Sequence, residues 1–103
     1  MIAEITVLPI GSGSHLTGPI ARIVDLVRQS GLSHEVTALG TLVEGGDDAV
    51  WALLRQCHEV ALQSAERVVT DIRIDQTRGR EGGLREPVAR IAEALAADDL
   101  EQV

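Results

Sequence analysis

Two segments of the chain, residues 2–9 and 67–75, show the two-residue alternation that is typical of β-strands. In the first segment, one face is expected to carry Ala3, Ile5 and Val7, and the other face Ile2, Glu4, Thr6 and Leu8. In the second, one face is expected to carry Val68, Thr70, Ile72 and Ile74, and the other Val69, Asp71, Arg73 and Asp75. Two shorter strands, 34–40 and 41–44, are predicted to meet near Gly40.

Three other segments carry apolar residues at the three- and four-residue spacing of a helix. The first, 16–30, has an apolar stripe of Leu16, Ile20, Ile23, Val24 and Val27. The second has a stripe of Val50, Leu53, Leu54, Cys57, Val60, Ala61 and Ser64. The third has a stripe of Leu84, Val88, Ile91 and Leu95. Asp47 or Asp48 is expected to cap the second helix, and Gly31 to end the first.

The order of these elements is strand, helix, strand, strand, helix, strand, which predicts an α+β domain of the ferredoxin-like type. We expect a βαββαβ antiparallel sheet with two helices on one face, plus a C-terminal helix. Residues 1–80 are expected to form the ligand-binding domain, and residues 81–103 a helix and acidic tail of the same domain. At 103 residues the chain is long enough for one domain.

Two helices on one face leave the other face of the sheet uncovered. That open face is expected to mix polar side chains (Glu4, Thr6, Glu35, Thr37, Asp71 and Arg73) with apolar ones (Ile2, Leu8, Leu39 and Val69). Such a mixture suits an interface between copies of the chain that encloses a polar cavity. The alternative is a solvated face with scattered hydrophobic residues.

Composition narrows the choice of partners. Trp51 is the only aromatic residue, so the core must consist of aliphatic side chains, and self-association would add burial. A net charge of −7 argues against nucleic acid or an anionic membrane as partner. Cys57 is the only cysteine, and the first residues form a strand pattern rather than a basic leader, so we expect a cytoplasmic protein.

Few residues suggest catalysis. Cys57 lies in an apolar stripe and is expected to be a core residue, and His58-Glu59 lacks the second histidine of a zinc-binding helix. The Gly-rich turn at 11–14 precedes a helix, as in phosphate sites, but matches no phosphate-binding pattern. An enzyme that acts on a small substrate, with Glu4, Glu35 or Asp71 as acid or base, is the hypothesis we rank last, and we expect a non-catalytic protein.

Three stretches resemble the MTH1187/YkoF-like thiamine-binding family, also known as DUF77 or UPF0045. They are ITVLPIGSGS at 5–14, HEVTALGTLVEG at 34–45 and AERVVTDIRIDQTRG at 65–79. The resemblance spans about residues 2–80 and preserves the order and spacing of the motifs. The hairpin departs from the family pattern at Ala38-Leu39, where many relatives carry Pro-Met, and at His34, where Tyr is commoner.

The resemblance implies an oligomeric, non-catalytic protein that binds thiamine or its hydroxymethylpyrimidine part and uses no cofactor or metal. It also implies self-association into dimers that pair into tetramers. By position, the ligand-binding residues would be Thr6, Val7, Leu8, Thr37, Thr41 and Glu44. Because no aromatic residue belongs to this set, aliphatic side chains would have to enclose the pyrimidine. A homo-oligomeric interaction module without a ligand is the second hypothesis.

Overall fold

The computed structural model describes residues 1–11, 17–79 and 95. Its strands are β1 (Ile2–Ile10), β2 (Ser33–Val36), β3 (Thr41–Glu44) and β4 (Arg67–Asp75). Its two long helices are α1 (Thr17–Gln29) and α2 (Asp47–Leu62). The predicted C-terminal helix and tail lie outside the described residues, except for Leu95, which is helical.

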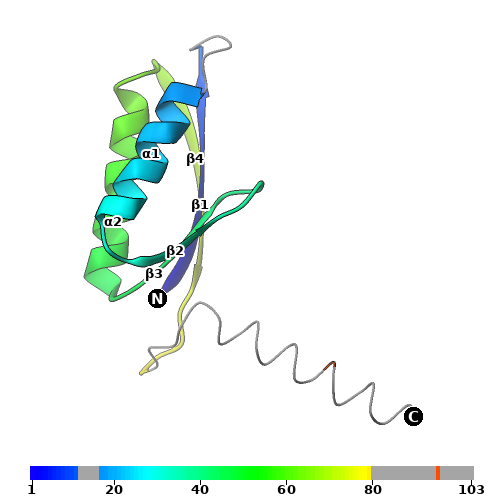
Figure 1. The fold of residues 1–103 in the computed structure, drawn as a ribbon, viewed down its shortest axis with the longest axis vertical. Coiled ribbons are helices and arrows are strands. Elements are labelled where there is room, and N and C mark those ends of the chain that lie inside the picture. The colour runs from blue at the N-terminus through cyan, green and yellow to red at the C-terminus, as the bar shows by residue number, and fades with distance from the viewer. Residues whose placement is uncertain (12–16, 80–94, 96–103) are drawn as a thin grey trace.

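The strands form one antiparallel sheet in the order β2-β3-β1-β4. Both helices cover the same face of that sheet, and the described part of the chain leaves the other face bare (Figure 1). This arrangement confirms the predicted ferredoxin-like α+β fold. The β2–β3 hairpin curves, and its tip extends past the sheet on the side away from the helices (Figure 1).

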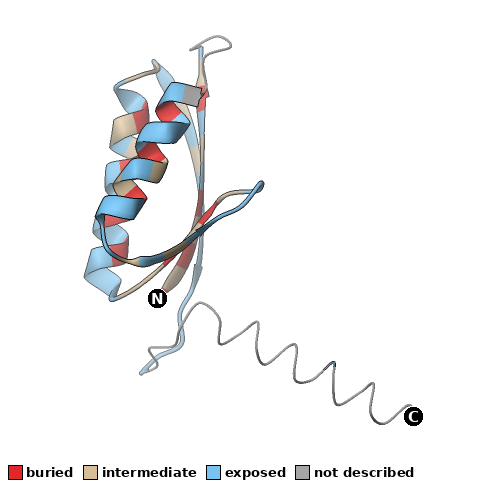
Figure 2. Ribbon diagram, viewed as in Figure 1, coloured by how far each residue is buried: buried red, intermediate tan, exposed pale blue. Residues whose placement is uncertain are grey.

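The strand register confirms which side chains share a face. Ala3 pairs with Val43 and Ile74, and Ile5 pairs with Thr41 and Ile72, so these residues all face the helices. The core lies between that face and the helices (Figure 2), and it consists of Met1, Ala3, Ile5, Ile23, Val27, Val43, Val50, Leu53, Leu54, Cys57 and Ala61. No aromatic ring contributes to it, because Trp51 is 52% exposed.

Local geometry at two helix ends tests the sequence predictions. Gly31 has the left-handed φ of 73° that was expected after the first helix, and only glycine adopts this conformation readily. The prediction that Asp47 or Asp48 caps α2 is wrong. Gly46 occupies the N-cap, and both aspartates lie in the first turn, where their charge favours the positive end of the helix dipole.

The second strand is shorter than predicted, because it ends at Val36 rather than at Gly40. The Thr37 hydroxyl accepts hydrogen bonds from the backbone N–H groups of Leu39 and Gly40, each at 3.2 Å. The backbone N–H of Thr37 also donates to the Gly40 carbonyl at 2.9 Å. These local bonds hold residues 37–40 as a turn and take the place of continued strand pairing.

Cys57 is a core residue, as predicted, and burial raises the pKa of its thiol from 9.0 to about 11. The unfolded chain therefore loses the thiol proton at a lower pH than the folded chain does. The contribution of this thiol to the stability of the folded protein is fully present below pH 9 and is lost as the pH rises towards 11. We expect the free energy of unfolding in urea to fall over this interval, and to fall less in a Cys57→Ala variant. An equal fall in both proteins would contradict the assignment.

None of the helices in the described part of the chain is long and apolar enough to cross a bilayer.

Candidate functional site

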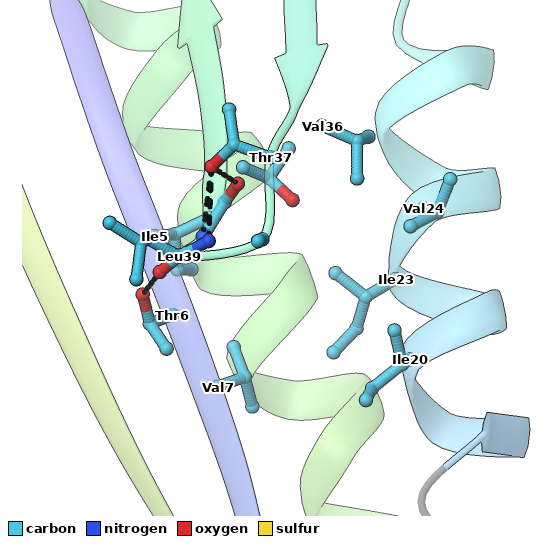
Figure 3. A pocket seen from close by; sticks show the side chains of 12 residues that line it. Ile5, Thr6, Val7, Ile20, Ile23, Val24, Val36, Thr37 and Leu39 are labelled. Atoms are coloured by element: carbon cyan, nitrogen blue, oxygen red, sulfur yellow. Dashed lines mark hydrogen bonds between the residues drawn. The ribbon is translucent and has the colours of Figure 1, made fainter.

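A pocket opens where the β2–β3 hairpin separates from β1. The pairing of β1 with β3 ends at Ile5 and Thr41, whereas β1 continues to Ile10 alongside β4 alone. Helix α1 packs chiefly against α2 and only lightly against the sheet. The curved hairpin, the second half of β1 and the flank of α1 therefore leave a space between them (Figure 3).

The pocket has a cavity volume of about 200 Å³ and mostly aliphatic walls. Its lining residues are Ile5, Thr6, Val7, Ile20, Ile23, Val24, Val36, Thr37, Ala38, Leu39, Gly40 and Thr41. None of these side chains is charged, and the only side-chain polar groups are three threonine hydroxyls. This volume is smaller than the roughly 300–1,000 Å³ typical of pockets that enclose drug-sized ligands. It therefore suits a single neutral ring.

Two of the three hydroxyls are engaged in holding the hairpin turn. Thr37 Oγ1 donates to the Gly40 carbonyl at 2.9 Å, besides accepting the two backbone hydrogen bonds described above. Thr6 Oγ1 on β1 donates to the Leu39 carbonyl at 2.9 Å and so ties the turn to the central strand (Figure 3). Because the turn is held by its own bonds, this wall of the pocket is formed before any ligand arrives.

The third hydroxyl, that of Thr41, is different. Thr41 is 8% exposed and faces the helices beside Ile5, and it is the only buried polar residue in the described part of the chain. Its hydroxyl makes no hydrogen bond to any described residue, although it lines the pocket. Buried hydroxyls nearly always have a partner, since an unsatisfied one costs about 1–3 kcal/mol. The pocket therefore contains a polar group that a ligand can satisfy.

Gly40 sets how closely the hairpin approaches β1. A Cβ atom added there would lie 2.8 Å from Thr6 Oγ1 and 3.0 Å from the Ile5 carbonyl oxygen. Both distances are too short, and the carbonyl belongs to rigid backbone. We expect Gly40→Ala to push the turn away from β1, break the Thr6–Leu39 hydrogen bond and weaken ligand binding.

Gly46→Ala provides the matched control, since a Cβ atom at Gly46 would meet nothing within 4 Å. Titration calorimetry and thermal unfolding of both variants would check the expectation. Equal affinities in the two variants would contradict the role given to Gly40.

The structure brings together four of the six ligand-binding residues predicted from the sequence. Thr6, Val7, Thr37 and Thr41 line the pocket. Leu8 and Glu44 do not line it, and the register places both on the open face of the sheet, opposite Val69 and Ile2 respectively. Their assignment to the site stays a prediction that would need a ligand extending beyond this pocket.

The pocket also differs in position from the cavity expected on the open face, because much of it lies on the side of the sheet that the helices cover. Ile20, Ile23 and Val24 of α1 form a wall that the sequence analysis did not assign to the site. The sequence held one signal, because Ile20 belongs to the apolar stripe of the predicted first helix. The structure shows that Ile20 borders the pocket rather than packing in the core, and it is 47% exposed.

The other candidate groups have structural roles. His58 Nδ1 is hydrogen-bonded to Thr70 Oγ1 at 2.6 Å, which joins α2 to β4. Glu59 pairs with Arg55 on the exposed face of the same helix. Among residues 1–11 and 17–79, no three His, Cys, Asp or Glu side chains are grouped so that they could hold a metal ion. The strongest candidate site in the described structure is thus the threonine-lined pocket.

Comparison with known proteins agrees with the fold. A family model described as thiamine-binding protein matches residues 3–100. A UPF0045 protein of Methanothermobacter thermautotrophicus is 33% identical over 96 residues, which covers 90% of this chain and 97% of that protein. The UPF0045 protein MJ1052 of Methanocaldococcus jannaschii is 25% identical over 93 residues, covering 90% of this chain and 93% of the relative.

Solved structures extend the likeness to three dimensions. The crystal structure of MJ1052 superposes with a TM-score of 0.80 at 25% identity, over 89% of this chain and 95% of that one. A DUF77 domain from Bacillus cereus, at 23% identity, superposes with a TM-score of 0.77 over 84% of this chain and 85% of that one, which shows a shared fold. The match to the family model over nearly the whole chain confirms the resemblance seen in the sequence motifs, and the chain belongs to the thiamine-binding protein family.

Proposed function

We propose that this protein binds the aminopyrimidine part of thiamine, or free hydroxymethylpyrimidine, in the threonine-lined pocket, and that it does so without catalysis. The observation that carries the proposal is the Thr41 hydroxyl, which is buried, lines the pocket and has no partner among the described residues. A hydroxyl both donates and accepts, so it suits a ring that offers ring nitrogens and an exocyclic amine.

The walls of the pocket match the rest of such a ring. A pyrimidine presents two flat faces of low polarity, and the side chains of Ile5, Val7 and Ile23 offer aliphatic surfaces against which they can pack. No carboxylate lines the pocket to neutralise a cation. The positively charged thiazolium of thiamine would therefore lie outside it, towards solvent or a neighbouring chain.

The family supports a thiamine-related ligand. Its model carries the description thiamine-binding protein. A Thermotoga maritima protein with the same fold (TM-score 0.76, 24% identity, 87% of this chain and 96% of that one) bears a name that assigns it, provisionally, to thiamine biosynthesis or salvage. At that identity the likeness itself shows only the fold.

The pocket rim favours closure by a second copy of the chain. Ile20, Val36 and Leu39 surround the opening and are 47%, 55% and 83% exposed. A neighbouring subunit that covered these three residues would exclude water from the pocket and enlarge the binding site, and burial of apolar surface would stabilise the assembly. We therefore propose a homo-oligomer, in which dimers pair into a tetramer, as the binding-competent form.

Titration calorimetry tests the proposal directly. Hydroxymethylpyrimidine and thiamine are expected to bind, whereas the N-methylated hydroxyethylthiazolium cation is not, because no carboxylate lines the pocket to neutralise its charge. Thermal unfolding in the presence of each compound should show stabilisation by the same two ligands. Absence of binding heat from both at millimolar concentration, with the protein folded, would refute the proposal.

An interaction module without a ligand is the second candidate, and the open face favours it. Leu8 and Val69 lie opposite each other there, at 49% and 37% exposure. A protein that forms a stable oligomer by light scattering but fails the calorimetric test would support this function instead.

A further inference from the structure

A second exposed apolar surface lies along β4, which is the edge strand at the opposite side of the sheet from β2. Ile72 and Ile74 of this strand pair with the buried residues Ile5 and Ala3, so they project from the same face of the sheet, towards the helices. They are nevertheless 41% and 39% exposed, because β4 is an edge strand and α2 covers them only in part. Much of β4 is accordingly exposed in Figure 2.

Trp51 of α2 borders these two isoleucines. Asp47 Oδ2 accepts a hydrogen bond from Gln76 Nε2 at 2.7 Å, and His58 is bonded to Thr70 at 2.6 Å, so α2 runs antiparallel to β4 along this length. At about 100° per residue, positions 47, 51 and 58 of a helix lie within about 40° of one another. Trp51 therefore faces the stretch of β4 between Thr70 and Gln76.

That stretch contains Ile72 and Ile74, and together with Trp51 they form what we call the Trp51 patch. Trp51 is 52% exposed, although an indole is the largest apolar surface that any side chain provides. None of the three residues lines the threonine-lined pocket. The patch is thus a separate surface, and it lies beside an edge strand that pairs only with β1 within the described residues.

The chain also carries a matching apolar stripe. Residues 84–95 have the spacing of a helix with one apolar side, made of Leu84, Val88, Ile91 and Leu95. Leu95, the member of this stripe that the structure describes, is helical and 60% exposed. A single chain therefore leaves both the patch and the described end of the stripe in contact with solvent.

We propose that residues 84–95 of a second copy cover the Trp51 patch, so that two copies exchange these segments about a two-fold axis. Each of two identical chains presents one patch and one stripe. Across a two-fold axis, the stripe of each chain packs on the patch of the other. The chain leaves β4 at Asp75, directly beside the patch. The eight residues 76–83 separate the strand from the stripe and span at most roughly 26 Å, so the stripe can extend to a neighbouring subunit.

Trp51 provides its own probe, because it is the only aromatic residue in the chain. In the full-length protein we expect Ile91→Asp to move the Trp51 emission to longer wavelength, to increase its quenching by acrylamide and to halve the mass of the smallest stable assembly in light scattering. Ala89→Asp introduces the same charge about 200° around a helix from Ile91, and it should leave all three readouts unchanged.

A mixing experiment tests the exchange itself. A full-length Trp51→Phe chain has an intact stripe and no fluorescence, whereas the Ile91→Asp chain has Trp51 and a broken stripe. After the two are mixed and allowed to exchange subunits, the Trp51 emission of the second chain should return to shorter wavelength.

Two results would overturn the proposal. If Ile91→Asp leaves emission, quenching and mass as in the parent protein, residues 84–95 do not cover the patch. If Ile91→Asp shifts the emission but mixing does not restore it, the covering segment belongs to the same chain. Neither readout depends on ligand binding, so failure here is distinguishable from failure of the proposed function.

Discussion

Replacing Thr41 by valine is expected to weaken hydroxymethylpyrimidine binding by roughly 5- to 100-fold while leaving the folded protein at least as stable as before. The loss corresponds to about 1–3 kcal/mol, the cost of leaving a polar group of the ligand unsatisfied in a buried site. Stability is not lost, because the Thr41 hydroxyl has no partner among the described residues. Valine matches threonine in shape and suits a strand.

Thr70→Val is the matched control for this prediction. Thr70 also faces the helices, but from β4, and its hydroxyl is bonded to His58 at 2.6 Å outside the pocket. Its loss should lower the free energy of unfolding by about 0.5–1.5 kcal/mol and leave affinity unchanged. Calorimetric titration and urea unfolding of both variants separate the two effects. A Thr41→Val protein that binds as tightly as the parent would remove Thr41 from the site.

Truncation of Leu54 to alanine is expected to lower the free energy of unfolding by about 2–5 kcal/mol. Leu54 is 1% exposed and is among the largest fully buried side chains of the core. The buried core contains no aromatic ring and consists mostly of small or β-branched side chains, which have limited freedom to fill a cavity. Since domains are typically stable by only about 5–15 kcal/mol, the variant should be marginally folded at 37 °C.

Leu62→Ala on the same helix supplies the comparison. Leu62 is 47% exposed, so the same atoms are removed from a site that is already half in solvent. Its cost should be about 1 kcal/mol or less. Urea unfolding at several protein concentrations gives both values and separates the contribution of subunit association. Equal losses in the two variants would mean that the core is not where the structure places it.

Much of the fold follows from local patterns. The alternation in residues 67–75 predicts β4 with its bounds, and the stripe through Leu53, Leu54 and Cys57 predicts the buried side of α2. The spacing of apolar side chains is enough for both predictions, because side chains return to the same face at a fixed interval in a strand and in a helix. The hairpin was less predictable, since the Thr37 hydroxyl competes with strand pairing and ends β2 four residues early.

The candidate site was predicted in part. The family motifs directed attention to Thr6, Val7, Thr37 and Thr41, which the fold brings together. The wall from α1 could not be predicted, because it depends on where the helix lies over the sheet. Glu44 shows the converse: it is three residues from Thr41, and so it points to the opposite face of the sheet.

The sequence by itself determined the elements of this protein, their order and the face that each one buries, since these depend on the spacing of residues within a single segment. Only the tertiary structure decided that the hairpin separates from β1 beyond Ile5, that the resulting space is a pocket, and that the Thr41 hydroxyl is buried in it without a partner. The reason is physical. A pocket is the volume that packed elements fail to fill, and that volume depends on distances between segments far apart in the chain.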